Sequence, residues 1–481
     1  MNATPLGNEL LVILPEIVLL AFALLALIWA QFLGERAPGR IAAAAALGTV
    51  LALASLFFAA QAASGPVLFG AVAADGFSVF IRAVLYAGAL LVILGGAGYI
   101  RRFGVPAGEF YSLFLLAMTG GGFMAAAANV LTFYVGLELL SLSSYALAGL
   151  RLDDPDSNEA SLKYFLNGAV SSAILLFGLS WLFGLTGTLD LAGTAAALAS
   201  SSAHPALIVT AVTFVVAGLG FKMATVPFHL WVPDVYQGAP TPVTAFLSVG
   251  SKGAALAAAL RLFYEGMGPL AERWTVYFAL LAAVTMTWGN VSGLLQRNIK
   301  RMLGYSSIAH AGYLLVGLAA GSEQGVWAAM FYLLAYTFTN LGAFTVVMVV
   351  RNSGGAFEID GYAGLARRNP FVAGAMTVFF LSLIGFPFTA GFFGKLYLIG
   401  AAVNSGLIWL AVLTAINSVI SVGYYYGVVR NMYLRESDTE QPAVTLGGSD
   451  RLATALALVM TLGIGIVPQF LSWAQASALF P

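Results

Sequence analysis

Long apolar runs, separated by short polar stretches, occupy almost the whole sequence. A helix needs about 20 mainly apolar residues to cross a bilayer. Runs of that length predict about fourteen transmembrane helices, centred near residues 21, 52, 88, 119, 140, 172, 215, 252, 283, 311, 337, 385, 419 and 461. A membrane β-barrel would show short segments of alternating polarity instead. The pattern therefore predicts an all-α polytopic membrane protein.

Composition supports this fold class. The chain is 60% hydrophobic and 9% charged, whereas soluble domains are about 25% charged. The longest polar stretches, residues 151–163 and 434–451, have the size of loops, so we expect a single membrane domain over residues 1–481. The chain has no cysteine, which excludes disulfides, thiolate metal sites and cysteine-bound iron–sulfur clusters. We therefore expect no redox centre in this chain.

Basic residues are distributed unevenly among the loops, which are numbered here by the helix that each follows. Only Arg261 and Arg273 fall in even loops. Fourteen fall in odd loops: Arg36, Arg40, Arg101, Arg102, Arg151, Arg297, Lys300, Arg301, Arg351, Arg367, Arg368, Arg430, Arg435 and Arg451. Because cytoplasmic loops are enriched in lysine and arginine, the odd loops are predicted to be cytoplasmic and both termini to face outward. The first span, which lacks a basic leader, is predicted to be retained.

Two Pro-Phe pairs interrupt long apolar runs, in TVPFHLW of helix 7 and GFPFTAGF of helix 12. Five helices separate them, so helices 4–8 (residues 109–263) and 9–13 (residues 273–432) are predicted to form two five-helix repeats of opposite orientation. Inverted repeats with paired broken helices are common in secondary transporters and place ion sites near the midplane. The alternative is two unrelated prolines, which transmembrane helices tolerate.

Four lysines lie within predicted spans. An ionisable group at membrane depth costs roughly 2.5–3.5 kcal/mol on insertion scales and by default marks an ion or proton path. Lys252 lies about 18 Å from either helix end at about 1.5 Å per residue, beyond the reach of a side chain that snorkels to the surface. Lys395 follows Pro387 by eight residues and is the candidate outward end. Lys163 begins helix 6, where snorkelling remains a reasonable alternative.

Helices 5 and 7 carry further candidates. Glu138 is mid-helix, and we expect it to pair with Lys222; the alternative is a neutral acid bonded to a serine on a neighbouring helix. His229 follows Lys222 by seven residues and would share its face if the helix continued past Pro227. Loss of hydration favours the neutral amine of a buried lysine, and a nearby carboxylate favours the ammonium ion. A moveable Glu–Lys contact is therefore predicted to switch the lysine between holding and releasing a proton.

Three other polar residues lie within spans. His310 is mid-span beside serines, and the relay and structural interpretations both stay open. Arg82 and Glu16 lie near span ends, and we interpret both as structural.

The run FKMATVPFHLWVPDVYQGAPTPVTAFLSVGSKGAAL resembles the signature of the antiporter-like, proton-conducting membrane family. Its members include the three large membrane-arm subunits of respiratory complex I, Mrp antiporter subunits and membrane-bound hydrogenase subunits. FYVGLELLSLSSYAL, KYFLNGAVSSAILLFG, RNIKRMLGYSSIAHAGY and GFPFTAGFFGKLYL extend the resemblance across nearly the whole chain. The chain resembles one of the three complex I subunits more than the other two. It has a lysine in helix 12, where a second subunit typically has glutamate, and it lacks the long C-terminal extension with a lateral helix that the third subunit has.

The resemblance implies roles for individual residues. Glu138 and Lys222 match the family's ion pair, Lys252 its central proton carrier and Lys395 its outward carrier. Lys163 and His229 match the lysine at the start of helix 6 and the histidine near the break of helix 7, whereas His310 has no assured counterpart.

The resemblance also implies cofactors and partners. NADH, FMN, iron–sulfur clusters and quinone would be bound by other subunits. The neighbours would be subunits M and K and the lateral helix of subunit L, in a bacterial inner membrane. We expect the lipid bilayer, and no nucleic acid, as a further partner. The alternatives are a cation/proton antiporter subunit of the Mrp type and a scaffold subunit that conducts nothing.

The bias of basic residues generates a topology prediction. Reporter fusions after Arg102 and after Arg301 should both report a cytoplasmic location, and a fusion after Pro481 a periplasmic one. A periplasmic signal from either arginine-rich loop would reverse the orientation.

Overall fold

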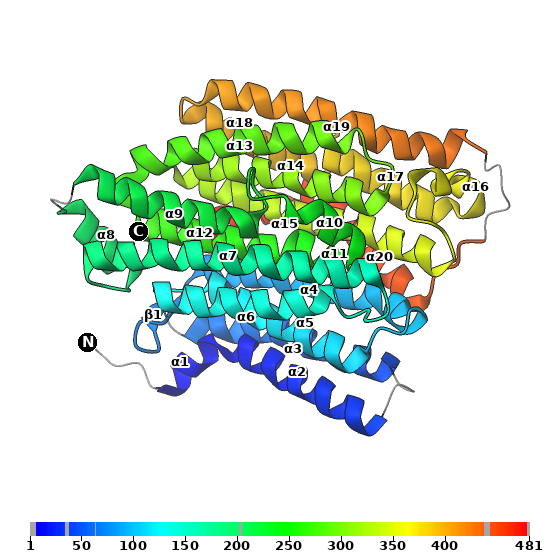
Figure 1. Ribbon diagram of the computed structural model, residues 1–481, viewed down its shortest axis with the longest axis horizontal. Helices are drawn as coiled ribbons and strands as arrows, with labels where there is room; N and C mark the ends of the chain where they lie inside the picture. Colours follow the sequence, from blue (N-terminus) through cyan, green and yellow to red (C-terminus); the bar gives the residue numbers. More distant parts are fainter. Residues whose placement is uncertain (1–5, 34–37, 63, 202–203, 437–442, 479–481) are drawn as a thin grey trace.

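The computed structural model describes residues 6–33, 38–62, 64–201, 204–436 and 443–478. Arg36 and the two chain ends, on which part of the orientation prediction rests, lie outside the described residues. Apart from two three-residue strands, the regular elements in the described part are helical, as the sequence predicts. Figure 1 shows the long helices running side by side in one bundle.

Fourteen helical segments in the described part correspond to the predicted spans. Two of them are broken into two helices, and one is an α-helix interrupted by a π segment. They are α2 (Leu14–Leu33), α3 (Pro38–Ala62), α4 (Gly76–Arg102), α5 (Ala107–Ala125), α6 (Val130–Ala148), α7 (Pro155–Thr186), α9 (Pro205–Met223) with α10 (Trp231–Gly238), α11 (Thr241–Phe246) with α12 (Lys252–Leu260), α13 (Ala271–Gly293), α14 (Ile299–Ala319), α15 (Glu323–Asn352), α17 (Pro370–Ile384) with α18 (Ala390–Asn404), α19 (Ile408–Leu434) and α20 (Gly448–Ile466).

Shorter elements connect or cover these spans. They are α1 (Leu6–Val12), β1 (Gly65–Val67), β2 (Val72–Ala74), α8 (Leu191–Ala199), the π segments η2 (Leu247–Ser251) and η3 (Arg261–Gly266), the 3-10 turns η4 (Gly268–Leu270) and η5 (Ile359–Tyr362), α16 (Leu365–Arg368) and α21 (Gln469–Ser477).

Thirteen of the fourteen predicted centres fall within these helices, and the centre near 385 falls at the break between α17 and α18. Within the described residues, twelve helices are long and apolar enough to cross a membrane. The two remaining spans are α5, which contains Glu109 and three successive glycines, and the broken pair α17–α18.

Even and odd loops gather at opposite ends of the bundle. The isolated bridges Val72↔Ala127 and Asn129↔Asp190 join loops that follow helices 2, 4 and 6, and the bridge Asn298↔Glu358 joins loops that follow helices 9 and 11. In Figure 1, β1 and α8 lie at the left end and α16 at the right end. The alternation that the sequence predicts for the loops is therefore present.

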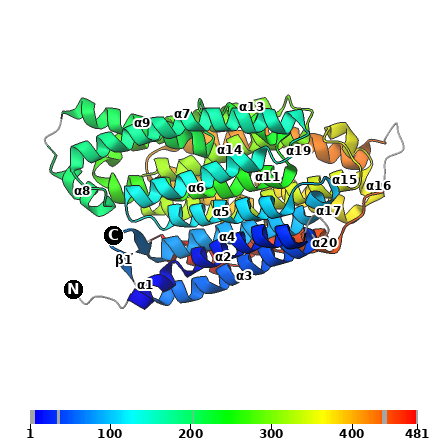
Figure 2. The same cartoon turned by 60° about the horizontal axis from the view of Figure 1, so that its bottom comes forward.

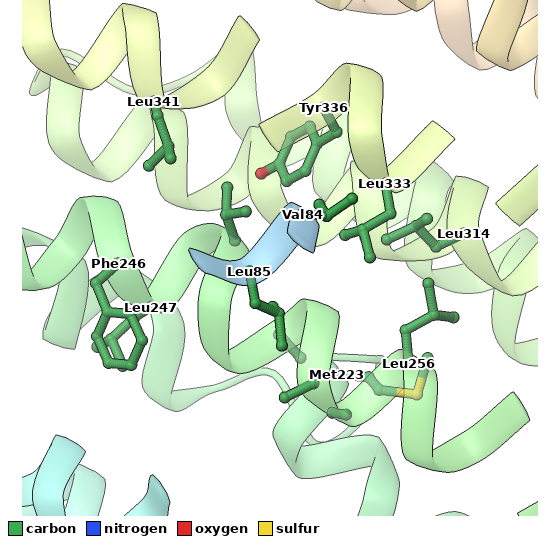
Figure 3. Close-up of a cluster of buried hydrophobic side chains, with 14 of the residues drawn as sticks. Val84, Leu85, Met223, Phe246, Leu247, Leu256, Leu314, Leu333, Tyr336 and Leu341 are labelled. Atoms are coloured by element: carbon green, nitrogen blue, oxygen red, sulfur yellow. The ribbon is translucent and has the colours of Figure 1, made fainter. Parts of the chain in front are cut away.

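The bundle is packed around α14 and α15. The central stretch of α15 is buried on all sides, and α4, α14, α17, α18 and α20 pack against it. Figure 2 shows α2 and α3 along one edge and α7, α9 and α13 along the opposite edge. Leucine, valine and aromatic side chains from α4, α11–α12, α14 and α15 meet in the interior (Figure 3). Polar side chains in this interior are therefore far from water.

Buried ion pairs hold the N-terminal helices to the rest. Arg82 contacts Glu16 at 3.3 Å with both side chains almost fully buried, and the Tyr86 hydroxyl donates to Glu16 at 2.7 Å. This agrees with the structural interpretation of Arg82 and Glu16. Arg261 differs from its predicted place in a loop, because it is buried in η3 and bonded to Asp75 and Glu265, each at 2.7 Å.

Candidate functional site

Lys222 lies in the last turn of α9, immediately before the break in helix 7. The helix ends at Met223, where Ala224 adopts a positive φ of 60°, and the chain becomes helical again at Trp231. The indole N–H of Trp231 donates to the carbonyl of Phe221 at 3.1 Å, which satisfies an acceptor at the break. The predicted interruption of helix 7 is confirmed.

Aromatic rings surround the Lys222 ammonium, which is 3% exposed. Its Nζ donates to the Tyr145 hydroxyl at 3.4 Å and lies 4.9 Å from the centre of that ring. The rings of Tyr164 and Phe221 lie 5.4 and 5.5 Å away. Ring faces attract a desolvated cation by about 2 kcal/mol, so this pocket can hold the charged form.

Glu138 contacts a serine instead of the predicted lysine. Its Oε1 accepts a hydrogen bond from Ser172 at 2.6 Å, and no ion pair with Lys222 occurs among the described residues. Lys222 contacts the Tyr145 hydroxyl instead. The prediction of a direct contact is therefore wrong for this conformation. Gly168 leaves room for the Tyr145 hydroxyl, because a Cβ there would overlap it.

Lys252 stands where the π segment η2 meets α12 and is 2% exposed. Its Nζ donates to the carbonyl of Ser307, and to the hydroxyl of the same residue at 2.6 Å. The side chain therefore stays inside the bundle and does not snorkel. The π segment was not predicted. Such segments are rare and are frequent at functional sites.

His310 lies on α14, one turn beyond Ser307, between two of the lysines. Its Nδ1 is 2.6 Å from the Tyr332 hydroxyl, and Nε2 is 3.4 Å from that of Tyr425. Tyr336 stacks on the imidazole at 4.7 Å. Lys252 bonds Ser307 one turn before His310 on α14, and Lys395 lies over the ring of Tyr313 one turn after it. A small cavity of about 10 Å³ lies between His310, Leu383 and Gly391.

Lys395 reaches back to the break in helix 12. Gly385 ends α17 with a φ of 94°, and the carbonyls of Leu383 and Ile384 each accept from Lys395 Nζ at 2.9 Å. The Tyr313 ring lies 4.5 Å from this nitrogen. The predicted interruption of helix 12 is confirmed, and the break supplies the acceptors for the lysine.

Lys163 is the one site lysine near the surface, with 41% of its side chain exposed. Its Nζ contacts Glu159 and Asp234, each at 2.6 Å. Asp234 on α10 also contacts Arg301 on α14 at 2.7 Å. Lys163 therefore belongs to a charged cluster at the odd-loop end of α7 and α10.

His229 does not share a helical face with Lys222, because the helix ends between them. It lies in the turn between α9 and α10, is 5% exposed, and packs edge-on against Trp288 at 6.0 Å. The structure separates His229 from Lys252, His310 and Lys395, which converge on α14.

Sequence reasoning missed Lys300, which was assigned to a loop. It is 2% exposed, and its Nζ donates to the carbonyls of Gln237 and Ala239 at 2.9 and 2.6 Å. Its neighbours Arg297 and Arg301 made the segment look solvated. The signal that was available is the spacing to Ser307, seven residues or two turns away on the same face of the helix. Within the described residues, no group of His, Cys, Asp or Glu side chains is arranged to hold a metal ion.

Comparisons with known proteins agree with this geometry. The family model described as NADH:quinone oxidoreductase/Mrp antiporter, TM, matches residues 127–421. NADH-quinone oxidoreductase subunit N 2 of Symbiobacterium thermophilum is 50% identical over 457 residues, 90% of each chain. The protein of that name from Sorangium cellulosum is 43% identical over 93% of each chain.

Solved structures show the same fold. A chain of respiratory complex I from Thermus thermophilus matches with a TM-score of 0.79 and 34% identity, over 95% of this chain and 98% of that chain. A chain of the Mrp complex from Dietzia matches with a TM-score of 0.83 but 22% identity, over 98% of this chain and 96% of that chain. The Mrp likeness extends to the fold alone. The resemblance inferred from the sequence is confirmed, and the chain belongs to the NADH:quinone oxidoreductase/Mrp antiporter transmembrane family.

Proposed function

We propose that this chain acts as subunit N in the membrane arm of an NADH–quinone oxidoreductase, where it conducts protons across the membrane as quinone is reduced elsewhere in the complex. The observation that carries this proposal is the set of three deeply buried lysines, Lys222, Lys252 and Lys395, which are joined by tyrosines, serines and His310. Buried charges without fixed carboxylate partners are expensive in a membrane and mark proton relays.

Neutral acceptors suit a lysine that exchanges protons. Lys252 and Lys395 are held by carbonyl and hydroxyl oxygens, which accept from an ammonium ion and from a neutral amine alike. Neither protonation state leaves its acceptors without a donor. A salt bridge would instead favour the charged form strongly. The proton can therefore leave either lysine without breaking an ion pair.

Hydroxyl groups lie between the lysines. The Tyr164 ring faces Lys222, and within the described residues its buried hydroxyl has no hydrogen-bond partner, like that of Ser251, which precedes Lys252. Tyr336 stacks on His310, and the cavity beside His310 extends to Leu383, whose carbonyl binds Lys395. The proposed order is Lys222, Lys252, His310 and Lys395, with Lys163 at the odd-loop surface. Glu138 modulates Lys222 across Tyr145.

The remaining assignments follow from this role. The chain is then a subunit of a proton-translocating NADH:quinone oxidoreductase, and NADH, FMN, iron–sulfur clusters and quinone are bound by partner subunits. Its neighbours are subunits M and K and the lateral helix of L, in the bacterial inner membrane with both termini periplasmic. The breaks in helices 7 and 12 support two inverted repeats, residues 109–263 and 273–432.

Two alternatives lead to other outcomes. An Mrp-type antiporter subunit has the same fold, but the relatives at 50% and 43% identity are named as subunits N. A scaffold subunit would use the same buried charges to transmit conformational change without exchanging protons. The alternatives differ in whether the buried lysines must release protons.

Replacement of Lys252 separates proton exchange from charge. Lys252→Ala should lower NADH-driven proton pumping in vesicles, normalised to the amount of assembled complex. Lys252→Arg should not restore it, because a guanidinium group does not release its proton at working pH. Full pumping by the arginine variant would exclude proton exchange by this side chain.

Glu138 and Lys222 should act on one step. The carboxylate favours the charged form of Lys222, so Glu138→Gln and Lys222→Met should disable the same transfer. The double variant should then be little worse than either single variant. Additive losses in the logarithm of the pumping rate would show independent roles, and normal rates in both single variants would support a scaffold.

A further inference from the structure

Lys300 is a buried lysine that the path described above does not use. Its Nζ lies 4.8 Å from the Phe357 ring and donates to the carbonyls of Gln237 and Ala239. These carbonyls end α10, where the helix dipole carries partial negative charge. Within the described residues Lys300 forms no ion pair, unlike Lys163 and Arg301, which share Asp234. Charges on Arg151, Arg351, Asp154 and Asp156 act on it at longer range.

One face of α14 leads from Lys300 to Lys252. Gly304 and Ser307 follow Lys300 on that face, and Ser307 lies about 10.5 Å further along the axis at about 1.5 Å per residue. The Tyr236 ring of α10 packs over Gly304, where an added Cβ would lie 3.4 Å from the ring. Its hydroxyl lies 3.3 Å from Ser307 Oγ, which contacts Lys252 Nζ at 2.6 Å. Tyr236 and Ser307 therefore form a polar link between α10 and α14 that ends at Lys252.

The same end of α10 meets the odd-loop surface. A surface cavity of about 110 Å³ is lined by Asp156, Glu159, Asp234, Gln237 and Arg301. Asp156 and Glu159 are exposed. The side chain of Gln237 faces this cavity and accepts from Arg301 at 3.3 Å, while its carbonyl accepts from Lys300. Lys300 thus stands between the cavity and the interior.

We propose that Lys300 and Tyr236 form a proton inlet that feeds Lys252 directly from the odd-loop surface, separately from Lys222. The inference rests on the proposed function and names a further residue that exchanges protons. A proton enters from the cavity to the Lys300 amine and forms an ammonium ion. That ion then releases a proton toward Tyr236 and Ser307 through water in the intervening space. Ser307 Oγ passes a proton to the Lys252 amine as it receives one from Tyr236, so both hydroxyls end unchanged.

The two carbonyls make this exchange possible. A neutral amine keeps two N–H donors, one for each carbonyl, and the ammonium ion has a third that is free to point toward Tyr236. Both states therefore satisfy Gln237 and Ala239. The competing explanation is that Lys300 only anchors the end of α10 through hydrogen bonds and charge.

Three substitutions separate exchange from anchoring. Lys300→Arg keeps the charge and N–H donors but does not release a proton, and Lys300→Gln keeps two N–H donors without charge. We expect both to lower NADH-driven pumping roughly tenfold per assembled complex. This is a conservative figure, because a positioned proton-transfer group typically contributes about 100-fold or more. Tyr236→Phe keeps the ring over Gly304 and should lower pumping severalfold. Arg297→Gln, which removes an exposed cation three residues away, is the matched control and should leave pumping unchanged.

The outcomes are distinct. Normal pumping by Lys300→Arg with a loss in Lys252→Arg would overturn the inlet and leave the proposed function standing. Normal pumping by both arginine variants would overturn the proposed function and the inlet with it. If Lys300→Gln does not assemble, the arginine variant and Tyr236→Phe decide the question, because each preserves the packing around α10. A loss in the Arg297→Gln control equal to that in Lys300→Arg would assign the effect to surface charge and also overturn the inlet.

Discussion

The structure depends on how lysine nitrogens are accommodated inside an apolar helix bundle. The chain has five lysines, and four of them are at most 4% exposed. Lys252, Lys300 and Lys395 all donate to backbone carbonyls. Lys300 and Lys395 use carbonyls at helix ends, which lack a partner within the helix, whereas Lys252 shares the Ser307 carbonyl within α14. Helix ends therefore supply the acceptors for two of the buried lysines.

Two helix ends each supply acceptors to a neighbouring cation. The end of α17 leaves the carbonyls of Leu383 and Ile384 for Lys395, and the end of α10 leaves those of Gln237 and Ala239 for Lys300. In helix 8, η2 ends where Lys252 begins α12. Half-helix ends that stabilise ions are the usual site architecture of membrane transporters. The same physical requirement explains the breaks and the position of the charges.

Much of this arrangement was predictable from the sequence. Apolar runs located the spans, and Pro-Phe pairs located the breaks in helices 7 and 12. The isolation of Lys252 within its span indicated its burial. The partners were not predictable, because a contact between distant helices leaves no periodic signal. Glu138 accepts a hydrogen bond from Ser172, and Tyr145 lies beside Lys222. The predicted alignment of His229 with Lys222 required a continuous helix, but the helix ends at Met223. Lys300 was hidden by the arginines around it.

The central claim is that the buried lysines alternate between ammonium and neutral amine during turnover. Nitrogen NMR of the membrane-embedded complex, with this chain alone carrying isotope-labelled lysine, distinguishes these two forms directly. Five lysine signals can be assigned by comparison with variants that each lack one lysine. The account predicts that the Lys252 signal differs between the complex with oxidised quinone and the complex with reduced quinone, and that it shifts toward the neutral amine in one of these two states. The surface residue Lys163 should remain charged throughout. An ammonium signal from Lys252 that stays unchanged in every state would contradict the account.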